Sequence, residues 1–364
     1  MTLTAPRTNP VTTLRGQVLK FAERITTPLV PADYLDVIDP LRTGAALRGR
    51  IVAINPETRD AVTLVIRPGR GWRCHTPGQY IRVGVDVDGV RQWRAYSLTS
   101  ATDRPDGCIT ITVKAIPDGV VSNYLVRRAR VGTVIQLDQA AGGFTLDNPA
   151  PAKVLFVTAG SGVTPVMGMV RNLPAAAATD VIVVHSAPTA ADVIFGGELR
   201  RLAARGRIQL VEIHTDTDGM LDVASLRDLM ADLPERHTWA CGPVGLLDTL
   251  ERHWASAGLA ERLHTERFRP TVIATGEGGT VTFTAAGTAV ENDGTESLLD
   301  TGEAAGVLMP SGCRMGICFG CVAPLRRGAV RDLRTGAITI AAEGDGVVIQ
   351  TCISAAAGPC DIAL

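Results

Sequence analysis

The cysteine spacing near the C-terminus constrains this chain more than any other feature. Cys313, Cys318 and Cys321 form a C-x4-C-x2-C run, and Cys352 follows after thirty intervening residues. Four thiolates at this spacing are typical of a [2Fe–2S] site, in which each iron takes two of them. A set of disulfides is disfavoured because nothing in the sequence indicates export, and zinc sites usually pair two C-x2-C knuckles. We therefore predict that these four cysteines ligate a [2Fe–2S] cluster.

The segments around this run resemble plant-type ferredoxins over about the last 85 residues. The matching segments are Val281-Thr-Phe, Ser297-Leu-Leu-Asp-Thr-Gly-Glu, Leu325 to Val330 and Ile349-Gln-Thr-Cys352. The resemblance implies a β-grasp ferredoxin domain of α+β class over residues 279–364. A glycine-bearing linker at residues 271–278 is expected to precede it.

Composition restricts the partners and the compartment. The formal net charge of −1 gives no basis for nucleic-acid binding. No apolar run approaches the roughly 20 residues that a membrane span needs, and the N-terminus lacks a charged-then-apolar signal pattern. The other cysteines are scattered, as expected of reduced thiols in a cytosol: Cys74, Cys108, Cys241 and Cys360. We expect a cytoplasmic protein without a transmembrane segment, which contacts a membrane only peripherally or through a partner.

Residues 1–45 are expected to form an N-terminal extension with a short amphipathic helix. Leu14, Val18, Phe21 and Ile25 fall at helical spacing, with basic residues nearby. Packing of this helix on the next domain is the favoured interpretation. Contact with a membrane or a membrane-bound partner is the alternative.

Two further domains are predicted from the change in hydrophobic period. Residues 46–149 contain six short strands with glycine-bearing turns, which indicates a small antiparallel β-barrel with one helix before its last strand. Residues 150–270 alternate strands with helices, which indicates a doubly wound parallel α/β sheet. The chain is thus expected to be multidomain.

One strand end in the first domain carries three chemistries that a flavin requires. Arg94 offers charge for phosphate, Tyr96 a flat surface for the ring, and Ser97 a hydrogen bond. Strand alternation places Arg94 and Tyr96 on one face and Ser97 on the other, unless the strand bends. Taken alone, Tyr96 would be better explained as a barrel core residue.

Together with the sheet that follows, this strand resembles the ferredoxin–NADP reductase superfamily over about residues 46–270. The resemblance implies that Arg94 contacts the flavin phosphate, Tyr96 stacks on the isoalloxazine and Ser97 hydrogen-bonds near N5. Lys114 and the Gly119-Val120-Val121-Ser122 segment match the part that holds a pyrophosphate, which favours FAD over FMN. Gly78 and Gln79 match the preceding strand. A solvated strand lysine is the alternative for Lys114.

The nicotinamide nucleotide has its own implied site. Gly160-Ser-Gly162-Val-Thr164-Pro165 joins a strand to a helix, and its glycines allow close approach of a pyrophosphate to the helix N-terminus. Cys241-Gly242-Pro243 matches the superfamily's C-G-P, in which the cysteine lies near the nicotinamide, although a buried strand-end cysteine is the plainer interpretation. Ser186 follows the second strand and fits either nucleotide; we lean only slightly to NADPH over NADH, with Arg200 and Arg201 as distant candidates. Phe268 is the candidate to cover the second flavin face.

The domain order implies an electron-transfer enzyme, an NAD(P)H:acceptor oxidoreductase of the ferredoxin reductase type. Its implied catalytic residues are Ser97, Cys241 and Tyr96. The favoured acceptor is an oxygenase-type partner, most of all a membrane di-iron desaturase or alkane hydroxylase, because the N-terminal extension is similar to actinobacterial reductases of that kind. The overall order also resembles phenylacetyl-CoA epoxidase reductase. Alternatives are a soluble Rieske dioxygenase or cytochrome P450 system and, less favoured, a redox-sensing subunit.

Overall fold

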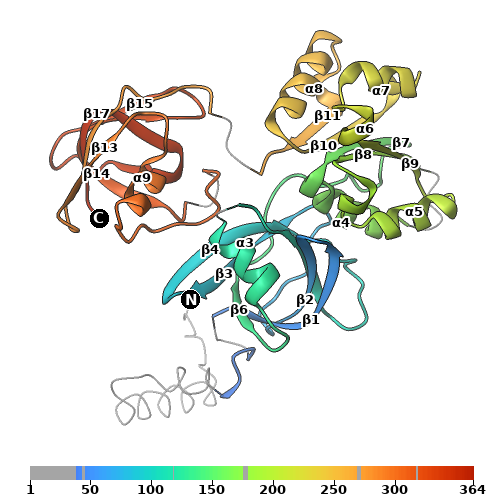
Figure 1. Cartoon of the computed structure of the whole chain (residues 1–364), viewed down its shortest axis with the longest axis horizontal. Helices are drawn as coiled ribbons and strands as arrows, with labels where there is room; N and C mark the ends of the chain where they lie inside the picture. The colour runs from blue at the N-terminus through green and yellow to red at the C-terminus, as the bar shows by residue number, and fades with distance from the viewer. Residues whose placement is uncertain (1–37, 43–45, 118, 175–178, 269–271, 317–318) are drawn as a thin grey trace, which may run out of the picture.

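The computed structural model describes residues 38–42, 46–117, 119–174, 179–268, 272–316 and 319–364. The predicted helix within residues 11–25 therefore lies outside the described residues, as does Cys318. Figure 1 shows sheet-containing units in chain order: a twisted sheet, a sheet covered by helices, and a further sheet with one helix.

The first unit is a six-stranded antiparallel sheet in the order β4-β3-β6-β1-β2-β5. A bridge between Leu98, just after β4, and Ile111 of β5 brings the two edges together and closes the sheet. The apolar run of β2 is buried throughout its first six residues, as expected for a strand that faces a barrel core. The strands are β1 (Arg48–Thr58), β2 (Ala61–Pro68), β3 (Tyr80–Val87), β4 (Val90–Ser97), β5 (Ile109–Lys114) and β6 (Val134–Leu137).

A short helical segment connects β5 to β6. It begins as α3 (Val120–Asn123) and continues as a π-helical turn over Tyr124–Arg128. Val121 and Leu125 of this segment enter the barrel core. The predicted helix is thus confirmed at its expected place, but it consists of an α-helical part followed by a π-helical turn.

The second unit is a five-stranded parallel sheet in the order β11-β10-β7-β8-β9. Parallel strands covered on both faces should be continuously apolar, and β8 is buried over its last seven residues. The predicted strands and helices are all present, and β11 was not predicted. The strands are β7 (Lys153–Ala159), β8 (Asp180–Ala187), β9 (Gln209–His214), β10 (His237–Cys241) and β11 (Leu263–Glu266); the helices are α4 (Val163–Asn172), α5 (Gly196–Ala204), α6 (Thr215–Asp218), α7 (Val223–Leu229) and α8 (Val244–Ser256).

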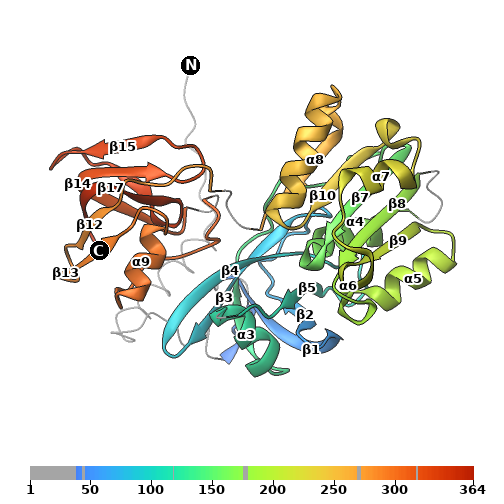
Figure 2. The same cartoon turned by 45° about the horizontal axis from the view of Figure 1, so that its top comes forward.

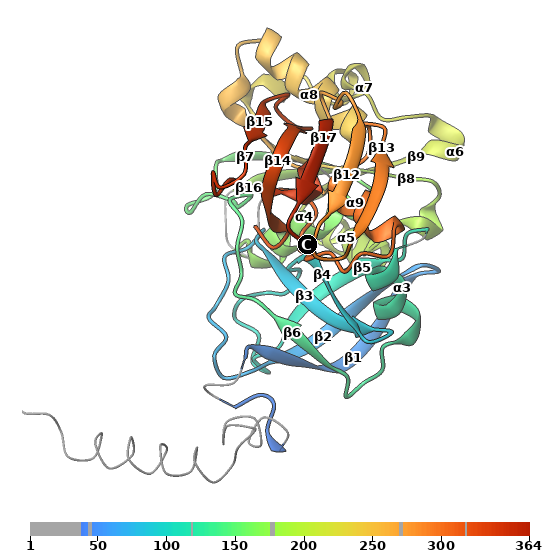
Figure 3. The same cartoon turned by 90° about the vertical axis from the view of Figure 1, so that its left-hand side faces the viewer.

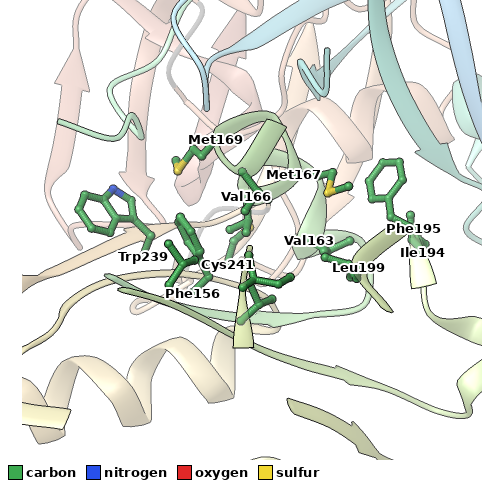
Figure 4. Packing of buried hydrophobic residues seen from close by; sticks show 14 of the residues in the cluster. Phe156, Val163, Val166, Met167, Met169, Ile194, Phe195, Leu199, Trp239 and Cys241 are labelled. Atoms are coloured by element: carbon green, nitrogen blue, oxygen red, sulfur yellow. The ribbon is translucent and has the colours of Figure 1, made fainter. Parts of the chain in front are cut away.

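Helix α4 is held against the sheet by an apolar cluster. Figure 4 shows Val166, Met167 and Met169 of the helix above Phe156 and Trp239 of the strands. The helix residues at positions 163–170 are all buried, so α4 has little freedom to shift relative to β7 and β10. This rigidity fixes the glycine turn that leads into the helix.

The third unit is a mixed sheet in the order β13-β12-β17-β14-β15, with β16 paired to β14. Helix α9 packs on it; its N-cap is Ser297, whose side chain accepts from the backbone N–H of Asp300 at 3.1 Å. Figures 2 and 3 show α9 on the side of this unit that faces the first sheet. The elements are β12 (Gly279–Phe283), β13 (Thr288–Asn292), α9 (Leu298–Ala304), β14 (Val322–Asp332), β15 (Ile338–Ala341), β16 (Val348–Gln350) and β17 (Ser354–Ile362).

No helix in the described part of the chain is both long enough and apolar enough to cross a membrane.

Candidate functional site

A cavity of about 300 Å³ opens where the three units meet. Its walls include Arg94, Tyr96 and Ser97 from β4, so the three residues of the predicted flavin strand are brought together. Ser97 ends β4 and lines the same cavity as Tyr96. Ala95 between them lines it as well, so the expected alternation of side chains along the strand stays a prediction.

The polar groups of this strand fit a bound flavin. The hydroxyl of Ser97 is buried and has no hydrogen-bond partner among the residues that the structure describes, which is costly unless a ligand supplies one. Burial is the main cause that lowers the pKa of Arg94 to about 10, and burial likewise raises the pKa of Tyr96. The Arg94 guanidinium is desolvated and forms no ion pair with the described carboxylates. It is therefore suited to bind an anionic group of a ligand.

The predicted pyrophosphate segment lies along this cavity. Gly119, Val121 and Ser122 line it, while Val120 lines a neighbouring cavity. Gly119 is constrained, because an added Cβ would lie 2.4 Å from the Ser122 Oγ. Lys114 also lines the cavity, and its ammonium lies 3.5 Å from Asp60.

Two matched residues lie elsewhere. Gly78 and Gln79 are not among the residues that line the cavity, although their neighbour Tyr80 is. Gly78 has a φ of +97°, and an added Cβ would lie 2.1 Å from the Phe144 carbonyl oxygen. The Gln79 amide joins the loop around Gly142. Their role in this structure is to shape the loop before β3.

The glycine turn after β7 brings α4 close to the end of β10. Gly160 has a φ of +54°, and the Thr164 hydroxyl donates to the Ser161 carbonyl at 2.9 Å. An added Cβ at Gly162 would lie 2.0 Å from the carbonyl oxygen of Cys241, so only glycine fits this contact. Thr164 and Ser161 line the flavin-strand cavity. The predicted nucleotide turn thus adjoins the predicted flavin site.

Other predicted nucleotide residues lie at the same edge of the sheet. Cys241 is fully buried at the end of β10, and burial raises the pKa of its thiol. Gly242 and Pro243 follow it and lead into α8; Pro165 is buried within the first turn of α4. Ser186 is buried near the end of β8. Arg200 is ion-paired with Glu212 of β9, through bonds of 2.9 and 2.7 Å.

The cysteine run forms a loop beside the same cavity. Cys313, Cys321 and Cys352 are buried, and the Sγ atoms of Cys321 and Cys352 lie 3.1 Å apart. The loop contains left-handed backbone at Arg314, Gly316 and Phe319. Cys313 and Met315 line the flavin-strand cavity, whereas Phe319 is 68% exposed on the outer side of the loop. Among the described residues, no three His, Cys, Asp or Glu side chains gather at one metal position.

Comparisons with known proteins identify the two larger units. Residues 74–146 match the family described as oxidoreductase FAD-binding domain, and residues 156–252 match oxidoreductase NAD-binding domain. The chain is 49% identical to "NADPH oxidoreductase" of Mycobacterium tuberculosis, over 94% of this chain and 90% of that protein.

The chain belongs to the ferredoxin reductase superfamily. It is an NAD(P)H oxidoreductase with FAD- and NAD(P)-binding domains. The reductase is also 31% identical to the ferredoxin reductase component of a 3-ketosteroid-9-alpha-monooxygenase from Mycobacterium tuberculosis, with 77% of this chain and 85% of that protein covered. It is 30% identical to a glycine betaine monooxygenase reductase subunit from Chromohalobacter salexigens, with 76% and 84% covered.

Among solved structures, the reductase shares its fold with phthalate dioxygenase reductase. The TM-score is 0.60 at 24% identity, with 87% of this chain and 97% of that chain covered. Phthalate dioxygenase reductase is described as a modular structure for electron transfer from pyridine nucleotides to [2Fe–2S]. The similarity covers the fold of most of the reductase.

Glu266 is a site residue that the sequence reasoning missed. It ends β11, its backbone pairs with Cys241, and its side chain lines the flavin-strand cavity. Burial raises the pKa of Glu266 to about 8, and its Oε2 has no hydrogen-bond partner in the described part of the chain. The carboxyl is therefore largely protonated at neutral pH and can donate a hydrogen bond into the cavity. The available signal was the Glu266-Arg267-Phe268 strand end, in which Phe268 lines the same cavity as predicted.

His185 is buried in β8 near the nucleotide edge. Its Nδ1 lies 2.8 Å from the Thr158 hydroxyl, and its Nε2 has no partner. Burial lowers the pKa of His185 to about 4, with smaller effects of Glu212, which raises it, and of His214 and Lys114, which lower it. The imidazole is therefore neutral in the folded reductase at neutral pH.

We expect the reductase to lose stability in mild acid through this histidine. The unfolded chain binds a proton at its ordinary pKa of about 6.5, whereas the folded chain does not until about pH 4. Stability is thus fully present above pH 6.5 and falls as pH decreases toward 4, by about 3 kcal/mol at most. Guanidinium unfolding at pH 7 and pH 4.5 measures this change. His185→Asn should reduce the change in unfolding free energy between the two pH values, whereas His237→Gln should leave that change as in the wild type. An equal change in both variants would show that His185 is not its cause.

Proposed function

We propose that the reductase carries electrons from NAD(P)H through FAD to a [2Fe–2S] cluster in a C-terminal ferredoxin domain, and then to an oxygenase-type partner. One observation carries this proposal: Cys313 of the cysteine loop lines the same cavity as Tyr96 and Ser97. A cluster held by that loop would be next to a flavin held by β4. Electron transfer would then require no long-range path through the protein.

When bound, FAD supplies the step between two-electron nicotinamide chemistry and one-electron cluster chemistry. The chain's own residues would hold it in place. Arg94 would bind a phosphate, Tyr96 and Phe268 would cover the ring, and Ser97 would fill its missing hydrogen bond with a flavin atom. Glu266, protonated at neutral pH, would donate into the same pocket. Support for FAD over FMN comes from the matched FAD-binding family and from the predicted pyrophosphate segment along the cavity.

The described cysteines fit a [2Fe–2S] cluster. The Cys321 and Cys352 sulfurs lie 3.1 Å apart, so these two thiols are close enough to serve one iron after a small adjustment, and Cys313 with Cys318 would serve the other. The backbone N–H of Met315 lies 3.3 Å from the Cys313 sulfur, as expected where hydrogen bonds to thiolates tune a cluster. The shared fold with phthalate dioxygenase reductase supports the same assignment.

The partner is proposed from the names of the relatives and from the N-terminal extension. Two of the relatives compared are reductase components of monooxygenases, which supports an oxygenase as the acceptor. The finer proposal is a membrane di-iron desaturase or alkane hydroxylase, with the reductase cytoplasmic and at the membrane only through that partner. This finer proposal rests on the sequence of residues 1–45 alone, and the names of the relatives lend it no support. Co-sedimentation with desaturase-containing membranes, against oxygenase-free membranes as control, separates it from a soluble partner.

Anaerobic stopped-flow spectroscopy with NADPH and NADH in parallel tests the electron route. We expect flavin bleaching followed by loss of cluster absorbance, and the faster nucleotide identifies the physiological donor. Flavin bleaching without any cluster signal would refute the C-terminal part of the route. Absence of bleaching with both nucleotides would refute the reductase assignment.

Ser97→Ala should slow flavin bleaching by NADPH by about tenfold or more, with FAD still bound. The reason is that a charge-assisted or buried hydrogen bond is worth about 1.5–3 kcal/mol when its partner is left unsatisfied. Single-turnover stopped-flow at saturating NADPH measures the rate directly. Ser100→Ala is the matched control, because Ser100 is a buried serine shortly after β4 that lines neither of the two cavities around Arg94. Unchanged bleaching in the Ser97 variant would remove this hydroxyl from the reaction.

A further inference from the structure

Helix α4 contacts the barrel at the end opposite to the nucleotide turn. Ser161, just before the helix, and Thr164, in its first turn, line the flavin-strand cavity. At the other end of the helix, two side chains hydrogen-bond residues 99–102, which follow Ser97 in the barrel. One helix of the second unit therefore reaches both the cavity and the continuation of the flavin strand.

The helix and this part of the barrel approach each other at backbone distance. An added Cβ at Gly168 of α4 would lie 2.4 Å from the carbonyl oxygen of Leu98, so the contact leaves no room for a side chain. Leu98 is also the residue whose bridge to Ile111 closes the barrel. The helix thus rests on a fixed part of the first unit.

Asn172 attaches the last turn of α4 to the barrel. Its Oδ1 accepts from the backbone N–H and from the hydroxyl of Thr102, each at 2.9 Å. Its Nδ2 donates to the backbone carbonyls of Ser100 at 3.1 Å and Gly168 at 2.7 Å. An amide offers two donor hydrogens and two acceptor positions, so all four are used here. An aspartate of the same shape could keep the bonds to Thr102 but would place an oxygen against two carbonyl oxygens.

Arg171 makes a second attachment beside it. Its Nη1 donates to the Thr99 carbonyl at 2.5 Å, while its Nε and Nη2 donate to the Glu198 carboxylate at 3.0 and 2.7 Å. The guanidinium carbon lies 4.8 Å from the centre of the Phe195 ring. The carboxylate and the ring therefore orient the guanidinium toward the barrel. Within the part of the chain that the structure describes, no side chain of the second unit other than Arg171 and Asn172 bonds to residues 98–102.

We propose that Arg171 and Asn172 are positioning residues for the reduction of the flavin by the nucleotide. The proposal rests on the proposed function and adds that this pair aligns the nucleotide turn with the flavin strand. Thr164 and Asn172 are eight residues apart in α4, which is about 12 Å along a helix. A tilt of about 5° at the pair would shift the turn by about 1 Å, and a misplacement of that size can cost about 100-fold in rate.

Single-turnover stopped-flow over a range of nucleotide concentrations separates alignment from binding. The nucleotide is NADPH or NADH, whichever reduces the wild-type flavin faster. We expect Arg171→Gln and Asn172→Asp each to lower the saturating rate of flavin bleaching by about 10- to 100-fold, with the half-saturating nucleotide concentration changed by less than about threefold. Arg171→Lys should lie between, because lysine keeps the charge but lacks the planar fork.

Arg207→Gln is the matched control. Arg207 donates to the Leu173 carbonyl at 3.0 Å, at the same end of α4, but this bond stays within the second unit. The control should keep the wild-type rate. Hydrogen exchange of the flavin-loaded proteins gives a readout that does not depend on turnover. Backbone amides of residues 99–102 should exchange faster in Arg171→Gln and Asn172→Asp than in the wild type, and as in the wild type in Arg207→Gln.

A saturating rate equal to that of the wild type in both variants would overturn the proposal. A rate loss of the same size in Arg207→Gln would also overturn it, because the cause would be a general weakening of the helix end. So would a slower rate without faster exchange at residues 99–102. If Arg171→Gln and Asn172→Asp do not fold, Arg171→Lys carries the test with the same two readouts. Failure of the wild-type flavin to bleach with either nucleotide would refute the proposed function itself, so the two failures are distinguishable.

Discussion

A Cys352→Ser variant is expected to lose the visible absorption of the [2Fe–2S] cluster while its FAD is still reduced by NADPH. Cys321 directly precedes β14 and Cys352 lies in the short turn after β16, and their sulfurs are 3.1 Å apart. Removal of one thiolate leaves one iron with a single protein ligand, and clusters of this type need four cysteines. The flavin cavity takes none of its walls from Cys352, so flavin reduction should continue. NADPH-driven reduction of cytochrome c should fall to near the background rate.

Absorption spectra, iron content and single-turnover flavin reduction measure this separation of the two redox sites. Cys360→Ala is the matched control, because Cys360 is a buried cysteine of the same unit on β17, outside the cysteine loop. It should keep its iron. Loss of flavin reduction in a folded Cys352 variant would mean that the units are not functionally separable. Retention of a full cluster signal would show that Cys352 is not a ligand.

Gly162→Ala is expected to weaken nucleotide binding by at least about tenfold and to destabilise the fold by about 1–3 kcal/mol, the usual cost of overpacking. The added Cβ would meet the Cys241 carbonyl oxygen at 2.0 Å and its carbonyl carbon at 2.5 Å. Both are backbone atoms at the end of a central strand and cannot move aside easily. The start of α4 would have to lift away from β10, which removes the close approach on which nucleotide binding depends.

Gly245→Ala provides the control for this prediction. Gly245 lies in the first turn of α8, shortly after Cys241, and its added Cβ has no heavy atom within 4 Å. Alanine favours a helix over glycine, so this variant should be as stable as the wild type or more so. NADPH titration and thermal unfolding measure both effects. If both variants bound NADPH equally well and unfolded at the same temperature, the close contact between Gly162 and Cys241 would not matter for binding or stability.

Much of this architecture was predictable because the relevant signals are local. The glycine turn at Gly160 and Gly162 and the strand at Arg94 to Ser97 are contiguous segments, and the structure brings both to one cavity. Residues whose role depends on distant partners were not predictable. Glu266 ends a four-residue strand with no strong periodicity, and only its pairing beside Cys241 places it in the site.

The same reasoning explains why two residues matched in sequence lie outside the cavity. Gly78 and Gln79 match the superfamily in sequence. In the structure, however, the backbone at Phe144 packs against Gly78.

The cysteine loop has one side in the flavin cavity, at Cys313 and Met315, and another in solvent, at Phe319. On the proposed route, the donor and the acceptor of the cluster therefore meet different faces of a single loop. A partner could remain bound while the flavin reduces the cluster again. Successive electrons would then pass through one complex that does not dissociate. The Michaelis constant for the nucleotide would then not depend on the partner concentration, and the constant for the partner would not depend on the nucleotide concentration.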